Sequence, residues 1–254
     1  MKKQVLCIIF SLLCCISAVG AMLDDSTIVV LVDWQKTEKH YFRYFFDRYE
    51  VNSNDTIIRQ SICRDFTIEI DDSTQHLYSL IYNRVSLPTE ADSIVLDEFP
   101  LQLMTNHNGA LIKVLNWDSY LAWRDNDEEL CSDDLFPYVS LLSFNGKRLQ
   151  LNKTYFGSQL VKSSEIGLQG VDVVLKSSMT ATRDFEKSGE YALITIETVS
   201  TYHAKDDDSP IPVTDYFKQV VDSDKGWPIA TYSSRNEIKA NTQYITSWKI
   251  MLID

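Results

Sequence analysis

One stretch of the chain, Pro100–Cys131, joins a hairpin signal to a helical segment and constrains the fold more than any other. Asn108 and Gly109 separate two short apolar runs, 101–106 and 110–115. Asn and Gly tolerate the positive φ that a tight turn requires, so the runs predict two antiparallel strands joined by a turn. We expect a helix to follow this hairpin directly.

That helix is expected to begin after Asn116, whose side chain can accept a hydrogen bond from the free amides of the first helical turn. Trp117, Tyr120 and Leu121 then fall at i, i+3 and i+4, which is the spacing of one apolar helix face. The aromatic residues of this helix would therefore pack against the neighbouring strands.

A second short helix is predicted within 132–146, although this segment also has strand character. Ser132 or Asp133 would cap its start, Pro137 would lie near the first turn, and Asn145-Gly146 would end it.

Strand-like sequence lies on both sides of these helices. The segment 65–71 alternates apolar and polar residues, as a half-buried antiparallel strand does, whereas 40–51 carries aromatic residues on both of its faces. We therefore expect a mainly β (α+β) protein, an antiparallel incomplete barrel or a sandwich with one or two short helices in the middle of the chain. Residues 22–254 would form one β-rich domain, with strand-rich halves at 26–116 and 153–254 around a helical middle at 117–146.

The first 21 residues have the layout of a secretory signal peptide: two lysines, a short apolar run and then small residues. Cleavage after Ala21 would leave a mature chain that begins at Met22. Acylation at Cys14 or Cys15, as in a lipoprotein, is the alternative. Either version predicts an exported protein, periplasmic, outer-membrane-associated or secreted, with no transmembrane span in the mature chain, because the apolar run is too short for one.

The mature chain would be strongly acidic. Removal of residues 1–21 takes away two of the 24 basic residues and none of the 36 acidic ones, so the net charge changes from -12 to 22 − 36, or -14. A surface of this charge repels nucleic acid, and we expect no nucleic-acid partner.

Cys63 and Cys131 are the two cysteines that follow the signal segment. In an exported protein two thiols suggest one disulfide, which would close a loop of about 68 residues and stabilise the fold by ~4 kcal/mol. Two buried free cysteines that act as small apolar residues are the equal alternative.

Catalytic motifs are absent from the sequence. It has no nucleophile elbow, no zinc-protease helix motif, no paired Cys-x-x-Cys, no phosphate-binding loop and no dinucleotide fingerprint. We therefore predict no catalytic residue, no cofactor and no metal site, and a hydrolase with a site assembled from scattered acids or histidines is the weakest hypothesis.

Aromatic side chains are the remaining candidates for a binding site. Five of them could line a pocket for an acyl chain or stack on sugar rings: Phe42, Tyr44, Phe45, Trp117 and Tyr120. The alternative is that these rings form the core between sheet and helices.

Two segments resemble LolA-like lipoprotein carriers. They are GALIKVLNWDSY (109–120), in which a strand ends in Asn and passes into a helix, and VVDSDKGWPIATYSS (220–234), two strands around an acidic turn. Similar features occur in uncharacterised secreted or lipoprotein families of anaerobic Gram-negative bacteria. The resemblance implies an incomplete antiparallel barrel closed by short helices around an apolar cavity, and it leads us to expect a smaller apolar residue where Trp227 stands.

These observations favour a non-enzymatic exported β protein that binds a lipid, another apolar small molecule or a cell-envelope protein. A secreted or surface module that binds protein or glycan through exposed aromatic residues is the second hypothesis.

Overall fold

The computed structural model describes residues 22–24, 26–29, 32–52, 55–72, 78–85, 99–106, 108–141, 146–162, 172–185, 192–223 and 226–253. The expected signal peptide, residues 1–21, lies outside these ranges.

Fourteen strands and two helices follow one another in the described residues. Their bounds are β1 Met22–Asp24, β2 Thr27–Val29, β3 Lys39–Val51, β4 Thr56–Asp72, β5 Tyr78–Val85, β6 Leu101–Thr105, β7 Leu111–Val114, α2 Trp117–Trp123, α3 Glu128–Leu141, β8 Arg148–Gln150, β9 Thr154–Val161, β10 Val173–Phe185, β11 Ala192–Ala204, β12 Pro210–Asp222, β13 Pro228–Lys239 and β14 Thr242–Leu252.

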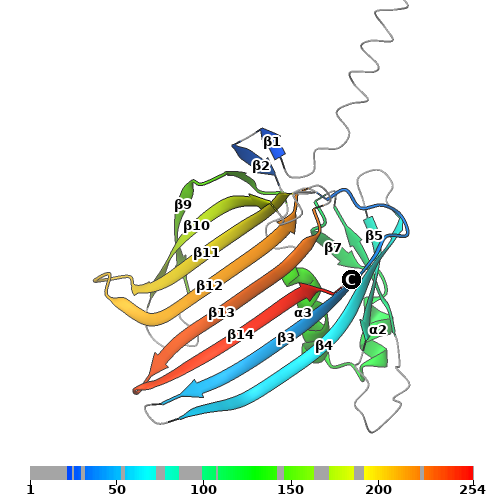
Figure 1. The fold of residues 1–254 in the computed structure, drawn as a ribbon. Coiled ribbons are helices and arrows are strands. Elements are labelled where there is room, and N and C mark those ends of the chain that lie inside the picture. Colours follow the sequence, from blue (N-terminus) through cyan, green and yellow to red (C-terminus); the bar gives the residue numbers. More distant parts are fainter. Residues whose placement is uncertain are drawn as a thin grey trace, which may run out of the picture.

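One antiparallel sheet of 11 strands dominates the fold, in the order β7-β6-β5-β4-β3-β14-β13-β12-β11-β10-β9. Each half of the chain is a simple meander, and the two meanders meet where β14 pairs with β3. The sheet curls around the helices but does not close into a barrel, because β7 and β9 remain its two edges (Figure 1). The predicted mainly β, antiparallel, incomplete barrel with two short helices is confirmed.

The hairpin between 101 and 115 forms as predicted. β6 pairs with β7, and Gly109 at the turn has a φ of 77°, which a residue with a Cβ rarely adopts. The predicted role of Asn116 is wrong, because its side chain makes no capping bond to α2. The side chain instead accepts a hydrogen bond from the Gln102 amide at 2.9 Å and donates one to the Pro100 carbonyl at 2.8 Å. It thus fixes the start of α2 to β6.

The second helix is present but begins earlier than predicted. α3 starts at Glu128, four residues before Ser132, so Pro137 lies inside the helix and not in its first turn. Proline has no amide hydrogen, so one internal hydrogen bond of α3 is missing there.

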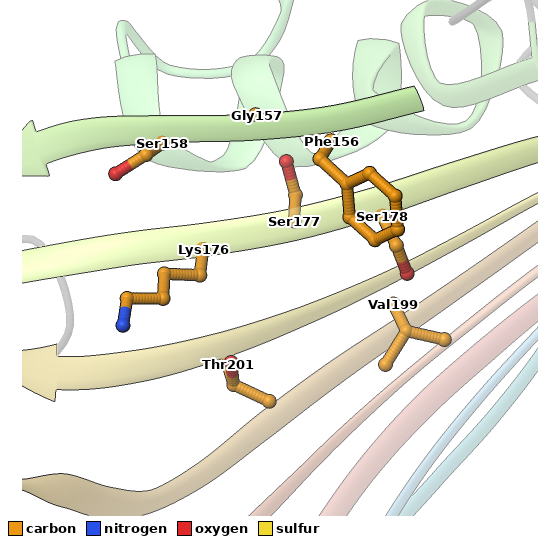
Figure 2. Close-up of a pocket in the computed structure, with 8 residues that line it drawn as sticks. All are labelled: Phe156, Gly157, Ser158, Lys176, Ser177, Ser178, Val199 and Thr201. Carbon is orange, nitrogen blue, oxygen red and sulfur yellow. The ribbon is translucent and has the colours of Figure 1, made fainter. Parts of the chain in front are cut away.

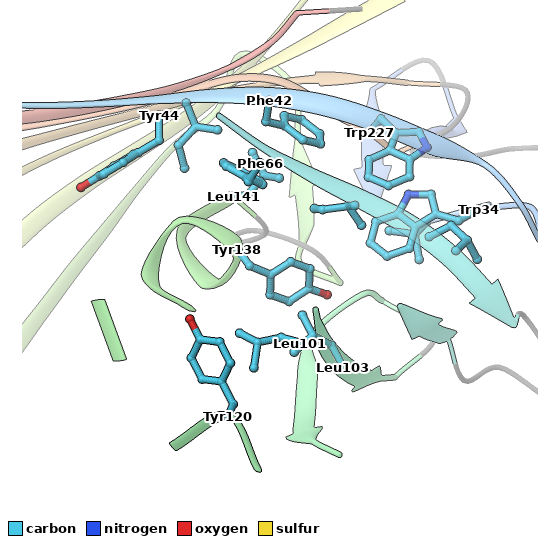
Figure 3. Close-up of a cluster of buried hydrophobic side chains, with 14 of the residues drawn as sticks. Trp34, Phe42, Tyr44, Phe66, Leu101, Leu103, Tyr120, Tyr138, Leu141 and Trp227 are labelled. Atoms are coloured by element: carbon cyan, nitrogen blue, oxygen red, sulfur yellow. The ribbon is translucent and has the colours of Figure 1, made fainter. Parts of the chain in front are cut away.

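The main core lies between the helices and the inner face of the sheet (Figure 3). Phe42 and Tyr44 of β3 both point into it, and Phe42 stacks on Phe66 of β4 with ring centroids 5.3 Å apart. From the helices, Tyr120 and Tyr138 pack against the same cluster. The side chains that alternate with these along β3 lie on the outer face.

A second, smaller core lies under the other half of the sheet. β1, β2 and β8 form a three-stranded sheet of their own. Ile28 and Leu149 from this small sheet pack on Ile194, Ile196 and Val221 of the large one. The inner face of the large sheet is thus covered by helices over one half and by the small sheet over the other.

Cys63 and Cys131 are free thiols in the structure, so the possible disulfide between them is not formed there. Cys63 is exposed and lies beside Phe45 on the outer face of the sheet. Cys131 is completely buried in the main core, and burial raises the pKa of its thiol because the thiolate is poorly solvated there.

We therefore expect iodoacetamide to label Cys63 in the native protein and Cys131 only after denaturation, since the reagent needs an accessible thiolate. Peptide mass spectrometry of both samples measures this. Protection of both thiols in the native, unreduced protein, with release by a reductant, would show that the disulfide forms after all.

Candidate ligand-binding groove

Cross-strand pairing arranges the inner face of the sheet in rows of different burial. In one row, Tyr44 of β3, Ile250 of β14 and Gln219 of β12 are buried beneath the helix layer. The next row, in the direction of the C-terminal end of β3, is half-buried and mostly apolar. We call it the apolar row, and its four large members are Ile62, Phe46, Trp248 and Phe217.

Helix α3 forms the wall above the apolar row. The Phe136 ring meets Trp248 edge-on at a centroid distance of 5.5 Å and Tyr44 at 6.3 Å. Phe136 nevertheless remains 39% exposed, and Val139, one turn further on, 51% exposed. Apolar side chains of the helix and of the sheet thus face each other without complete burial.

A cavity of about 310 Å³ lies between this wall and β3 and β4. This volume is at the lower end of the ~300–1,000 Å³ typical of small-molecule sites. We call the cavity the groove, and its lining residues are Tyr44, Phe46, Gln60, Ile62, Arg64, Asp133 and Phe136. The lining combines apolar and aromatic side chains with the polar side chains of Gln60, Arg64 and Asp133.

The row beyond the apolar row is polar. Arg48 and Gln60 pair across β3 and β4, and both side chains are exposed. A second hollow of about 290 Å³ lies here, and it shares Gln60 with the groove, so the two hollows adjoin. Its lining residues are Arg48, Glu50, Arg59, Gln60 and Tyr244.

Asp134 fixes the helix wall to the sheet. Its carboxylate is fully buried and accepts hydrogen bonds from Arg64 of β4 at 3.3 Å, from Arg124 Nε at 2.9 Å and from the Tyr120 hydroxyl at 2.7 Å. Burial and the bond to Asp134 both raise the pKa of Tyr120, which therefore stays a neutral donor at neutral pH. Through Asp134, the two guanidinium groups and the Tyr120 hydroxyl thus hold α2, α3 and β4 in one arrangement.

Tyr44, at the inner end of the groove, also stays neutral. Burial raises its pKa to about 12, because a phenolate would be poorly solvated there. Tyr44 therefore adds no charge to the inner end of the groove, where Arg64, which is paired with Asp134, lies opposite it on β4.

The structure does not bring the five predicted pocket residues into one pocket. Tyr44 lines the groove, whereas Phe42 is completely buried in the core. Phe45 lies on the outer face of the sheet, because successive residues of a strand point to opposite sides. Trp117 and Tyr120 pack in the core from α2.

The groove residues that sequence reasoning missed come from distant segments. Trp248 and Phe136 carry no local signal that distinguishes them from core residues. Alternation places Phe46 on the same face as Tyr44, but only the pairing with Ile62 and Trp248 shows that this face is half open.

No group of three or more His, Cys, Asp or Glu side chains that could hold a metal ion occurs in the described ranges. None of the helices described is long and apolar enough to cross a membrane.

Comparison with known proteins gives little. No family model and no curated protein matches the chain. Among solved structures it is similar to one described as "Lipid-protein interactions in lipovitellin", with a TM-score of 0.48 and 10% sequence identity over 87% of this chain and 26% of that one. The chain spans about a quarter of that protein's length. A likeness this distant carries no argument about function.

A larger hollow, of about 490 Å³, lies on the outer face between β9, β10 and β11 (Figure 2). Ser158, Lys176 and Thr201 line it together with Val199 and Phe156, and the Phe156 ring is 83% exposed. The helices lie on the other side of the sheet (Figure 2). Because a ligand there would be covered from one side, the smaller groove is the better candidate despite its volume.

Proposed function

We propose that this protein binds the apolar chain of a lipid-like molecule in the groove between α3 and the sheet, and that it does so as an exported protein of the cell envelope. The observation that carries the proposal is the half-open apolar row. Aromatic side chains from β3, β14 and α3 face one another there and remain partly exposed. The free energy falls when a ligand removes an apolar surface of this kind from water.

The open antiparallel sheet with helices on its inner face supports the proposal further. It is the architecture that the LolA-like resemblance implies, with an apolar cavity between sheet and helices. Transport of a lipid-bearing partner would be the corresponding role, and the apolar chain would be the part that the groove holds.

Chain length tests the proposal most directly. We expect the affinity for a series of saturated fatty acids to rise about fourfold for each added methylene, since each buried CH₂ contributes ~0.8 kcal/mol, and then to level off when the groove is full. Isothermal titration calorimetry below the critical micelle concentration measures the series. Affinity that does not change with chain length would contradict the proposal.

Two neighbouring residues provide a matched pair of variants. Phe46→Ser removes an aromatic ring from the groove floor, and we expect it to weaken binding by about tenfold, or ~1.4 kcal/mol. Phe45→Ser makes the same change on the outer face of the same strand and is expected to leave binding unchanged. Equal losses in the two variants would place the binding site elsewhere.

A further inference from the structure

The charges beside the groove leave one arginine without a partner. Arg48 makes no ion pair and no side-chain hydrogen bond with any residue that the structure describes. The other arginines next to the two hollows face carboxylates: Arg59 and Glu50 at 2.6 Å, Arg64 and Asp134 at 3.3 Å, and Arg235 and Asp215 at 3.8 Å. Arg48 is therefore the free positive charge at the open end.

Arg48 also has a defined place relative to the apolar floor. It follows Phe46 by two residues on β3 and lies on the same face, about 6–7 Å along the strand. Gln60, opposite Arg48 on β4, lines both the groove and the outer hollow. A ligand chain that lies over Phe46 and points outward would thus bring its other end to Arg48.

The chemistry of this end favours an anion. A guanidinium binds a carboxylate or a phosphate through two parallel hydrogen bonds, and the Tyr244 hydroxyl and the Gln60 amide of the same hollow can donate to further oxygens. The chain as a whole has a net charge of -12, so its general field repels anions and a local cation is needed to hold one.

We propose that the groove selects amphiphiles with an anionic head group, a carboxylate or a phosphate monoester, and that Arg48 binds this head while the apolar row holds the chain. This inference rests on the proposed function and adds the polarity of the ligand and its orientation, with the head at the open end of the sheet.

The experiment compares three probes that share one chain: dodecanoate, dodecyl phosphate and the neutral ester 1-monolauroylglycerol. Calorimetry with the full-length mature protein gives the affinities of the wild type and of Arg48→Gln. We expect the variant to bind both anions about three- to fivefold more weakly, as is usual for a partly exposed ion pair, and the neutral ester as before. Arg48→Lys should keep most of the anion preference.

Lys249→Gln is the matched control, because Lys249 is exposed on the outer face of the neighbouring strand β14 and its loss changes the net charge by the same amount. We expect this variant to bind all three probes like the wild type. If Arg48→Gln loses more affinity for dodecyl phosphate than for dodecanoate, the natural head group is a phosphate. If it loses more affinity for dodecanoate, the natural head group is a carboxylate.

Three results would overturn the inference in distinguishable ways. If the wild type binds all three probes equally and Arg48→Gln changes nothing, the apolar groove stands and the head-group assignment fails. If none of the three binds, the proposed function itself fails. If Arg48→Gln and Lys249→Gln weaken the binding of the anions equally, the overall charge of the protein and not Arg48 itself explains the effect.

Discussion

Asp134→Asn is expected to destabilise the protein by about 3 kcal/mol, which corresponds to a fall in Tm of roughly 6–12 °C for a chain of this size. The carboxylate of Asp134 is fully buried and is bound by Arg64, Arg124 and Tyr120. An amide of the same shape removes the negative charge and leaves two guanidinium groups without compensation. The arginine side chains keep 26% and 19% exposure, so the cost lies at the lower end of the range for broken buried ion pairs.

Urea denaturation followed by circular dichroism gives the free energy of unfolding, and the adjacent residue supplies the control. Asp133 is exposed on the same helix, and Asp133→Asn is expected to change the stability by no more than about 0.5 kcal/mol. If both variants unfold at the same urea concentration, Asp134 does not fix α3 to the sheet. If folded Asp134→Asn also loses affinity for fatty acids, the substitution has moved helix α3, which forms the wall of the groove.

The sequence predicted the kind of fold because local patterns decide it. Alternation along 65–71 and the Asn108-Gly109 turn are consequences of strand geometry and of backbone sterics, and both appear as β4 and as the β6–β7 hairpin. The helix at 117–123 follows from the spacing of its aromatic residues. These signals lie within a few residues of one another and need no knowledge of the rest of the chain.

The helix boundaries show where local reasoning failed. Asn116 has the residue type of a helix cap, yet the amide of Gln102, fourteen positions away, takes its oxygen. Likewise Ser132 and Asp133 resemble a helix start, but α3 continues through them, and Asp134 one position later is buried against Arg64 from β4. In both places a tertiary contact outweighs a local preference.

The groove could not be predicted because it depends on pairing between the ends of the chain. Phe46 and Trp248 are neighbours only because β14 pairs with β3 across some 200 residues of sequence. Aromatic residues on both faces of 40–51 left open which face would meet the helices. The sequence pattern consequently favours Phe45 as a pocket residue, whereas the ring next to it, Phe46, is the one that lines the groove.

Trp227→Ala is expected to cost about 4 kcal/mol, the largest effect of any single change proposed for this protein. Trp227 is only 2% exposed, and its ring stacks on Trp34 at 4.5 Å and lies 4.2 Å from the His40 ring. Its indole nitrogen donates to Glu38 at 2.9 Å. Trp227 therefore fills the space between the turn after β12 and the segment before β3. The resemblance to lipid carriers had suggested a smaller residue at this position.

Two further variants separate the sources of this stability. Trp227→Phe keeps most of the stacked ring but loses the bond to Glu38, and we expect it to cost about 1–2 kcal/mol. Phe156→Ala removes an aromatic ring that is 83% exposed on β9 and is expected to stay within about 0.5 kcal/mol of the wild type. Urea denaturation measures all three. The rings that Trp227 contacts, Trp34, His40 and Phe42, do not line the groove. Folded Trp227→Phe should therefore bind fatty acids like the wild type, and a parallel loss of affinity would link this end of the core to the site.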